Sequence, residues 1–210
     1  MVRLKGVNEQ GPHCSFLQKF QSSCKCLIHH GFAEPFFEQA YNGEVKFTVR
    51  DFRPADFLTL WQLDQSCFPP GIAYSQHELT IYIRRKTSFT LVAESGGPNG
   101  QLASSEPNSR IIGFLVAERA KTAGHIITID VRADARGRSV GSALLNAAEQ
   151  RLRSSGCEKI RLETAVDNLA ALSFYKKHGY SVARAIPGYY SNGVDGLLLD
   201  KDLLSPAGSE

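Results

Sequence analysis

The pattern of apolar and polar residues along the chain changes at about residue 44. Residues 1–44 show no helical or strand period and end in the turn-forming run Tyr41-Asn42-Gly43. From Val45 onward, apolar and polar residues alternate as they do in a half-buried strand. We therefore predict a partly ordered N-terminal extension over residues 1–44, one folded domain over residues 45–203 and a C-terminal tail over residues 204–210.

Within the domain, the apolar periods predict strands that alternate with helices. One helix begins at a capping box, in which Ser75 accepts from the third amide and Glu78 reaches back. The segment from Ile126 to Val131 is apolar at nearly every position, which is typical of a central strand buried on both faces. The predicted strands are residues 45–50, 89–94 and 110–118 (a hairpin with a long connection), 126–131, 159–164, 180 onward and 196–200; the predicted helices are 57–66, 75–86, a segment stopped by Gly156, and 169–177.

The composition is that of an ordinary single domain. The chain has 210 residues, of which 42% are hydrophobic, enough for one well-packed core. The 24 Lys and Arg against 21 Asp and Glu leave a net charge of +3, too little for a nucleic-acid binder that depends on bulk charge. No apolar run approaches the roughly 18 to 20 residues of a membrane span, and no secretion signal is visible. We expect a cytoplasmic protein with no nucleic-acid or membrane partner.

The cysteines indicate neither a disulfide framework nor a metal centre. Their number, five, is odd, and the chain is large enough to fold without covalent cross-links. Cys24, Cys26, His29 and His30 are residue types that zinc accepts, but their spacing fits no zinc finger. We predict no metal site; the alternative is that this Cys/His segment docks a metal or a partner.

A buried strand, a short turn and a Gly/Arg-rich helix start form the most informative segment. The unpaired amides and positive dipole end of a helix N-terminus attract phosphate, and small residues let an anion approach the backbone. Arginines can add charge-assisted hydrogen bonds, and the alternative is a tight turn with solvated arginines. The candidate anion-binding residues are Arg136, Gly137, Arg138, Ser139, Val140, Gly141 and Ser142.

The same segment carries a resemblance to a known family. Arg136-x-x-Ser139-x-Gly141 resembles the Gln/Arg-x-x-Gly-x-Gly/Ala acetyl-CoA loop of the GNAT family of N-acetyltransferases. The resemblance implies an α/β fold with a mixed, mostly antiparallel central sheet, flanking helices and splayed central parallel strands. Ser139 stands where the family usually has glycine, and we expect binding to survive if that position has helical torsions. The later segments Leu162-Glu163-Thr164, Asn168-x-x-Ala171-x-x-Phe174-Tyr175-x-x-x-Gly179-Tyr180 and Pro187-Gly188-Tyr189-Tyr190 look like the RimI-type branch, which acetylates protein N-terminal amines.

The resemblance also implies roles for single residues in a direct transfer from acetyl-CoA. The strand backbone from Ile129 to Val131 would hold the thioester carbonyl, and Asn168 would contact the cofactor arm. Tyr175 would be the general acid, with a core aromatic beside Phe174 as the alternative. Glu163 would be the general base, directly or through water, and the alternative is an ion pair with Arg161 or with a neighbouring strand.

The acceptor side is less defined by the sequence. By resemblance, Phe68 to Tyr74 and the pair Tyr189-Tyr190 flank the amine entrance, and tyrosines suit an extended peptide. A protein N-terminal amine is the favoured acceptor, with small amines, aminoglycosides or lysine side chains as alternatives. A non-catalytic acyl-CoA sensor is the competing class of protein, but such a binder has no evident need for an acid and a base. We expect a monomer or a homodimer.

Overall fold

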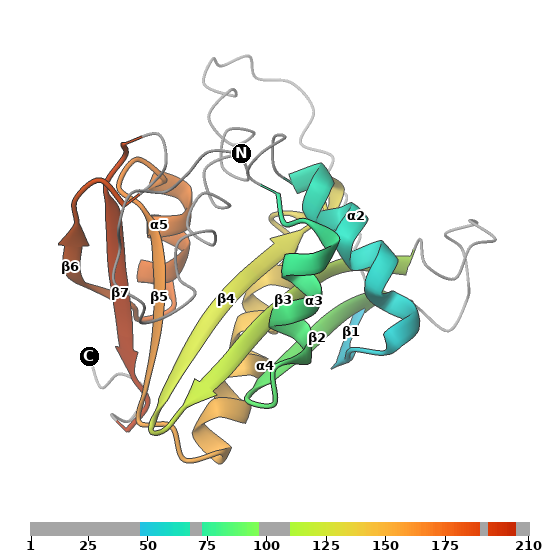
Figure 1. Cartoon of the computed structure of the whole chain (residues 1–210), viewed down its shortest axis with the longest axis horizontal. Coiled ribbons are helices and arrows are strands. Elements are labelled where there is room, and N and C mark those ends of the chain that lie inside the picture. The colour runs from blue at the N-terminus through green and yellow to red at the C-terminus, as the bar shows by residue number, and fades with distance from the viewer. Residues whose placement is uncertain (1–46, 68–72, 97–109, 190–192, 205–210) are drawn as a thin grey trace, which may run out of the picture.

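The computed structural model describes residues 47–67, 73–96, 110–189 and 193–204, and its seven strands form one sheet (Figure 1). Every neighbouring pair of these strands is antiparallel except β4 and β5, which are parallel. This mixed, mostly antiparallel sheet confirms the predicted fold class. In the order β1-β2-β3-β4-β5-β7-β6, the strands are β1 (Phe47–Asp51), β2 (Ser88–Ser95), β3 (Ile111–Ala120), β4 (Ala123–Val131), β5 (Lys159–Ala165), β7 (Gly196–Asp202) and β6 (Ser181–Ile186).

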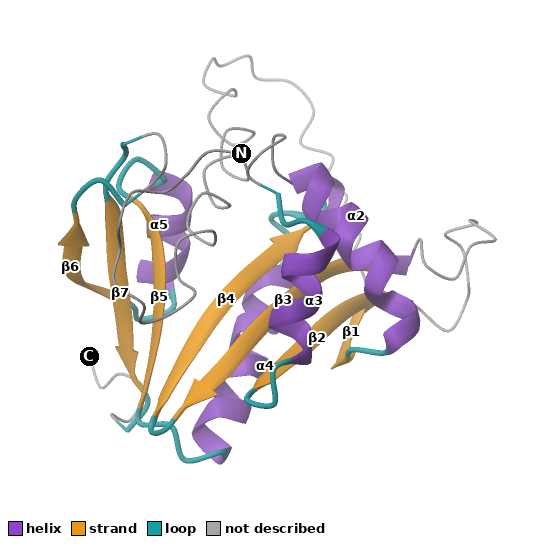
Figure 2. Ribbon diagram, viewed as in Figure 1, coloured by secondary structure: helices purple, strands orange, loops and turns teal. Residues whose placement is uncertain are grey.

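Helices cover both faces of the sheet (Figure 2). Helices α2 (Phe57–Cys67) and α3 (Gln76–Arg84) lie on one face, α4 (Val140–Ser154) lies on the other, and α5 (Leu169–Lys177) lies beside β5 and β7. The one-turn helices η3 (Pro54–Asp56) and η5 (Ala133–Ala135) precede α2 and α4. Helix α4 approaches β4 closely because Gly124 has no side chain: a Cβ there would lie 2.6 Å from the Leu152 side chain.

The predicted helices and strands are present, with differences at their ends. The capping box of α3 is formed, since Glu78 N donates to Ser75 Oγ (3.2 Å) and Ser75 N donates to Glu78 Oε2 (2.9 Å). Strand β4 begins at Ala123, three residues before the predicted start, because a tight turn with Lys121 at a φ of 57° joins it directly to β3. The Cys/His segment, the start of the first predicted strand and most of the 95–109 connection lie outside the described residues.

The two central parallel strands share only a short stretch of pairing. Residues 123–125 of β4 pair with residues 159–161 of β5, and beyond them the strands separate (Figure 1). Strand β4 also contains a bulge: Val116 of β3 pairs with Thr128 while Ala117 pairs with Ile126, so Ile127 is an extra residue. The expected splay is therefore present, and it opens the sheet beside the predicted cofactor loop.

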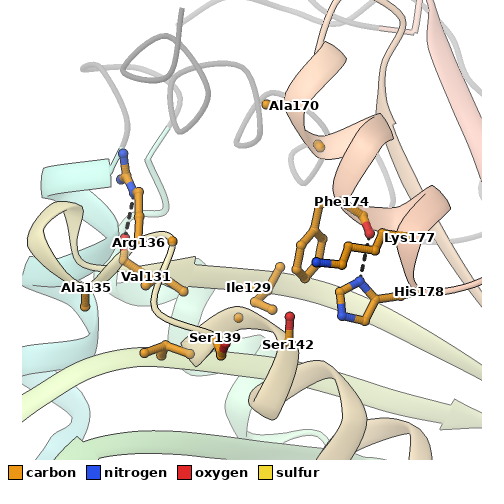
Figure 3. A pocket seen from close by; sticks show the side chains of 14 residues that line it. Ile129, Val131, Ala135, Arg136, Ser139, Ser142, Ala170, Phe174, Lys177 and His178 are labelled. Atoms are coloured by element: carbon orange, nitrogen blue, oxygen red, sulfur yellow. Dashed lines mark hydrogen bonds between the residues drawn. The ribbon is translucent and has the colours of Figure 1, made fainter. Parts of the chain in front are cut away.

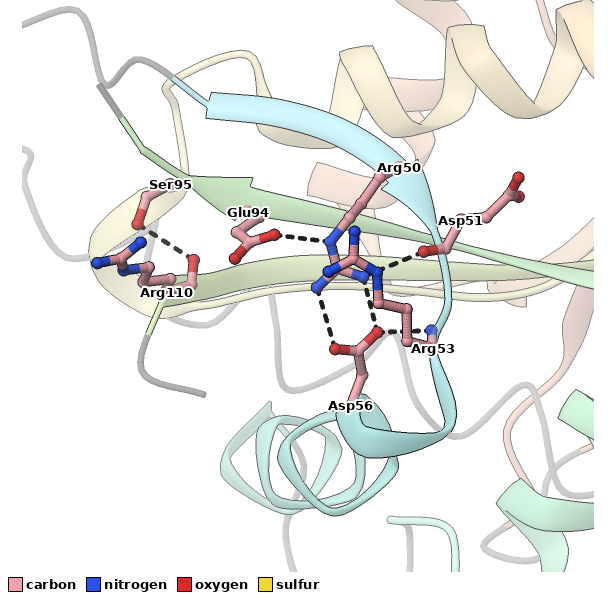
Figure 4. Close-up of polar contacts among 7 residues, drawn as sticks. All are labelled: Arg50, Asp51, Arg53, Asp56, Glu94, Ser95 and Arg110. Atoms are coloured by element: carbon pink, nitrogen blue, oxygen red, sulfur yellow. Dashed lines mark hydrogen bonds and ion pairs between the residues drawn. The ribbon is translucent and has the colours of Figure 1, made fainter. Parts of the chain in front are cut away.

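Arg50 ties the start of α2 to the edge of the sheet (Figure 4). Its guanidinium donates to Asp56 in η3 at 2.7 and 3.0 Å and to Glu94 on β2 at 2.6 Å. Burial alone would raise the pKa of Asp56, but the bonds from Arg50 and from the Arg53 amide outweigh it and lower that pKa below its usual value. The cluster fixes where α2 enters the fold, and α2 in turn holds residues beside the site.

Candidate active site

A pocket opens where β4 and β5 separate, between the start of α4 and helix α5 (Figure 3). Most of the predicted cofactor residues meet here, but Arg138, Asn168 and Tyr175 are not among the residues that line it. The lining consists of Ile129, Val131, Ala135, Arg136, Gly137, Ser139, Val140, Gly141, Ser142, Ala170, Ala171, Phe174, Lys177 and His178.

The first turn of α4 presents its backbone donors to this pocket. The first hydrogen bond of the helix runs from Ala143 N to Ser139 O (2.9 Å), so the amides of residues 140–142 have no acceptor within the helix. A Cβ at Gly141 would lie 3.6 Å from the Phe174 ring of α5, which places this turn face to face with α5 across the pocket. Together with the dipole of α4, these amides form the anion-binding helix start expected from the sequence.

Ser139 does not have the helical torsions on which the sequence argument depended. Its φ is 62° and its ψ is 4°, in the left-handed region, and Gly137 two residues earlier has a φ of 71°. A left-handed residue at the N-cap lets the chain turn sharply into α4, and it explains why a glycine is usual at this position. Serine can occupy it at a cost in backbone strain, while its amide stays available.

The two arginines of the loop are placed differently from what the sequence suggested. Arg136 lines the pocket, but its guanidinium points away from α5 (Figure 3), donating to Val131 O (3.0 Å) and to Cys67 Sγ (3.6 Å). Arg138 is exposed and lies outside the pocket lining. Burial raises the pKa of the Cys67 thiol to about 12, so this cysteine stays protonated and is a poor nucleophile.

Two basic residues that sequence analysis missed lie on the opposite wall. Lys177 and His178 line the pocket one turn after Phe174 (Figure 3). His178 Nδ1 lies 2.7 Å from Phe174 O, and the two rings lie 4.4 Å apart. Because the carbonyl can only accept, Nδ1 carries the proton and the other ring nitrogen is left for a ligand. Lys177 and His178 follow Phe174 by three and four residues, so on a helix they share its face, and this spacing could have revealed them in the sequence.

Asn168 and Tyr175 begin and nearly end the same helix, α5. Asn168 caps it, since its Oδ1 accepts from Ala171 N (3.1 Å), and its Nδ2 is buried with no hydrogen-bond partner among the described residues. Tyr175 is completely buried, with its ring 5.2 Å from Phe174 and 5.5 Å from Tyr180. Asn168 thus offers an unused donor to a ligand, whereas Tyr175 packs behind the pocket wall.

Glu163 is paired across the gap between the two central strands. Its Oε2 lies 2.8 Å from Nε2 of His125 on β4, and both side chains are largely buried. His125 also faces Glu118 of β3, with 3.7 Å between Nδ1 and Oε1. Burial opposes protonation of His125, but the two carboxylates outweigh it and raise its pKa to about 9. Glu163 is therefore a carboxylate beside a cationic imidazole, paired with a neighbouring strand rather than with Arg161.

The bulge at Ile127 decides which face each residue of β4 serves. Gly124 faces Leu152 of α4, so His125 points to the opposite face. After the extra residue the alternation is reversed, and Val131 lies on the α4 face, where its side chain is near Gly141. The phosphate-type pocket and the His125 ion pair consequently lie on opposite sides of the opening between β4 and β5.

Of the predicted acceptor residues, Tyr74 and Tyr189 are described, whereas Phe68 and Tyr190 lie outside the described residues. Tyr74 is buried, and α2 holds both of its backbone groups: its N–H donates to Asp64 Oδ2 (2.7 Å) and its carbonyl accepts from Gln65 Nε2 (2.8 Å). Tyr189 is half-buried and lies against Gly196 of β7. Tyr74 thus anchors the segment before α3, and Tyr189 remains accessible beside β7.

The described residues hold neither a cluster of metal-ligating side chains nor a membrane-spanning helix. Within residues 47–67, 73–96, 110–189 and 193–204, no group of three or more His, Cys, Asp or Glu side chains is arranged to hold a metal ion. None of the helices in these ranges combines the length and the apolar character needed to cross a bilayer.

Comparison with known proteins shows the family to which this fold and pocket belong. A family model described as "Acetyltransferase (GNAT) family" matches residues 57–180, and the chain belongs to this family. Family membership makes acyl transfer from acetyl-CoA the activity against which the site is compared below.

Relatives of known sequence cover parts of the chain. An uncharacterised N-acetyltransferase of Methanocaldococcus jannaschii is 34% identical over 98 residues, which is 46% of this chain and 63% of that protein. The match thus spans less than two thirds of that relative. N-alpha-acetyltransferase 30 of Schizosaccharomyces pombe is 27% identical over 127 residues, 58% of this chain and 77% of that protein.

Solved structures agree on the fold. Ard1 from Thermoplasma volcanium superposes with a TM-score of 0.64 at 25% identity, covering 76% of this chain and 99% of that one. The ribosomal-protein-S18-alanine N-acetyltransferase of Escherichia coli superposes with a TM-score of 0.63 at 18% identity, covering 79% of this chain and 98% of that one. These structures support the same arrangement of sheet and helices.

Proposed function

We propose that this acetyltransferase moves the acetyl group directly from acetyl-CoA to the N-terminal amine of a protein or peptide, in the manner of the RimI-type and N-alpha-acetyltransferase branches. The observation that carries the proposal is the opening between β4 and β5, which has a helix start and basic residues on one side and the buried Glu163 carboxylate on the other. Similarity to an N-alpha-acetyltransferase of Schizosaccharomyces pombe supports an N-terminal amine as the acceptor.

The residues of the α4 side fit the phosphate and pantetheine groups of acetyl-CoA. The amides of residues 140–142 supply donors for phosphate oxygens, and Lys177 adds a positive charge on the facing wall. The buried Nδ2 of Asn168, which has no partner among the described residues, is a donor suited to an amide or phosphate oxygen of the same ligand. When bound, acetyl-CoA supplies a thioester whose acyl carbon is open to attack by an amine.

Glu163 is our proposed base for the acceptor amine. One carboxylate oxygen is held by His125, which leaves Oε1 to accept a proton from the incoming ammonium or from a water beside it. The amine nitrogen then forms a bond to the acyl carbon as the carbon–sulfur bond breaks. Glu163 passes the ammonium proton to solvent and then takes the second proton that the nitrogen loses as the amide forms, while the sulfur receives a proton from a general acid that solvent reprotonates.

Tyr175 remains our candidate for that acid. Its position on α5, seven residues after Asn168, agrees with the resemblance to the family, and its buried ring is held in place by those of Phe174 and Tyr180. Substitution of this one hydroxyl tests the role directly.

The acceptor is tested with the full-length protein and a panel of amines. We expect release of free thiol from acetyl-CoA with N-terminal peptides and much less with polyamines, aminoglycosides or peptides whose only amine is a lysine side chain. Glu163→Gln should reduce kcat at least 10²-fold while acetyl-CoA still binds, because general-base catalysis is worth about 10² to 10⁴. Preference for a small amine would overturn the peptide assignment, and binding without turnover of any amine would indicate a sensor.

A further inference from the structure

The ion pair between His125 and Glu163 is the end of a longer chain of charges. On the far side of His125, Glu118 of β3 lies 3.7 Å away, and Arg85 donates to Glu118 Oε2 at 3.0 Å. Arg85 follows the last residue of α3 and lies over the Tyr82 ring, 4.6 Å from its centre. Four groups of alternating charge therefore connect α3 to the proposed base.

The sheet fixes the members of this chain relative to one another. Glu118 and His125 are directly paired across β3 and β4, and His125 is paired with Arg161, two residues before Glu163 on β5. The side chains of Glu118, His125 and Glu163 thus share one face of three adjacent strands. All three are largely buried, with side-chain exposures of 12 to 13%. Such closely packed charges cannot relax into water when one of them changes.

Each carboxylate acts on His125 in a different way. Glu163 accepts from Nε2, and the imidazole can keep that bond even when neutral, because one tautomer carries its proton on Nε2. The neutral form would then turn the lone pair of Nδ1 toward Glu118, which is unfavourable beside a carboxylate. Glu118 itself stays ionised, since its interactions with His125 and with Arg85 lower its pKa to about 2 against the effect of burial.

We propose that Glu118, held by Arg85, is a positioning residue that orients His125 and favours its protonated form, so that a charge-assisted hydrogen bond holds Oε2 of Glu163 and leaves Oε1 directed to the amine proton. The inference rests on the proposed function, because it assigns Glu163 the role of base. It adds that a residue two strands away from Glu163 sets the pH range over which the base works. Neither Glu118 nor Arg85 lines the pocket, so cofactor binding is expected to be independent of them.

The groups around His125 can be named for each neighbouring element. Strand β3 contributes Glu118, β5 contributes Glu163 and the exposed Arg161, and α3 contributes Arg85 by way of Glu118. Arg161 disfavours a second positive charge, so the two carboxylates must outweigh it. Replacement of Glu118 by glutamine should lower the pKa of His125, because an amide can donate to Nδ1 and so stabilise neutral His125.

The test combines a titration with a pH–rate profile of the full-length protein. Histidine ring signals are followed by nuclear magnetic resonance, and the signal lost in His125→Gln assigns His125. In Glu118→Gln we expect the pKa of His125 to fall by about 1 to 2 units. The alkaline limb of kcat/KM should move down by a similar amount, with the affinity for acetyl-CoA unchanged. Glu118→Asp keeps the charge, so it should bring both the pKa of His125 and the pH–rate profile part of the way back to their wild-type positions.

A matched control is Glu94→Gln, which removes an ion-paired strand carboxylate at Arg50, remote from His125. It should leave the His125 titration and the pH profile as in the wild type. Unchanged titration in Glu118→Gln would overturn the inference, as would a lowered pKa with an unshifted rate profile. If the wild type acetylates no amine, the proposed function fails, while the titration still decides whether Glu118 controls His125.

Discussion

Nε2 of His125 lies 2.8 Å from Oε2 of Glu163, at the point where backbone pairing between β4 and β5 has just ended. The ion pair thus continues the connection between the strands with side chains where the ladder of main-chain hydrogen bonds stops. The ion pair joins the two halves of the sheet, which is a structural effect. It also places a positive charge beside the proposed base, which is an electrostatic effect.

The stability of the protein should depend on pH through His125. Its pKa is raised from 6.5 to about 9 in the folded chain, so the folded state binds the proton more tightly than the unfolded state. The resulting stabilisation is complete below about pH 6.5 and is lost as the pH rises through about 9, with a total of about 3 kcal/mol. Urea unfolding at pH 6 and pH 9.5 measures the difference.

His125→Gln should flatten this dependence, and His77→Gln, at an exposed position on α3, is the matched control. If the wild type and His125→Gln lose equal stability between the two pH values, His125 is not the titrating group.

Ser139→Gly should stabilise the protein. The substitution relieves a left-handed residue, which costs about 1 to 2 kcal/mol, and loses part of that gain because glycine makes the unfolded chain more flexible, leaving about 0.5 to 1 kcal/mol. Lys121→Gly serves as the control, because Lys121 has nearly the same φ, 57°, in the β3–β4 turn away from the pocket. Both variants should gain stability in urea and keep their affinity for acetyl-CoA. A loss of stability in Ser139→Gly would mean that the hydroxyl contributes more than the strain costs.

Gly141→Asp should abolish the thermal stabilisation that acetyl-CoA gives the wild type. A Cβ at this position would make an ordinary contact with Phe174 at 3.6 Å, so the protein should fold. The carboxylate would lie in the first turn of α4, where it suits the helix dipole but repels phosphate. Gly141→Asn has nearly the same shape without the charge and should keep part of the shift. Equal shifts in wild type and Gly141→Asp would rule out a phosphate site at this turn.

Tyr175→Phe should lower kcat by at least tenfold while changing the dissociation constant of acetyl-CoA by less than twofold, if the hydroxyl protonates the leaving sulfur. Tyr180→Phe removes the hydroxyl of a neighbouring buried tyrosine, 5.5 Å away between ring centres, and should leave kcat nearly unchanged. Steady-state kinetics and equilibrium binding separate the two effects. Parallel losses of turnover and affinity would make Tyr175 a packing residue.

The sequence allowed the elements and the cofactor loop to be predicted because both depend on local patterns. Apolar spacing located α2, α4 and α5, and the glycines at positions 137 and 141 marked the sharp entry to α4. The family resemblance supplied the splay of the central strands, which no local pattern reveals. The extra residue at Ile127 depends on its pairing with β3, so nothing in the run Ile126–Val131 distinguishes it.

The site was predicted less completely than the fold, because side-chain direction depends on tertiary partners. Arg136 turns away from α5 toward Val131 O and Cys67, a residue 69 positions earlier in the chain, which no motif in the loop could show. His125 received no role from its sequence context, since its two carboxylate partners lie on other strands. Lys177 and His178, by contrast, follow Phe174 at helical spacing and were open to prediction.

Because of its bulge, β4 contributes odd-numbered residues to both faces of the sheet, the cofactor side and the proposed acceptor side. Up to His125, odd-numbered residues belong to the face of α3, and from Ile129 onward they belong to the face of α4. A regular strand with the same residues would place His125 and Val131 on one face, because two-residue alternation would run unbroken through Ile127, and Asp130 would then face α4. The one extra residue in β4 thus decides which face of the sheet holds the acetyl donor and which holds the amine acceptor.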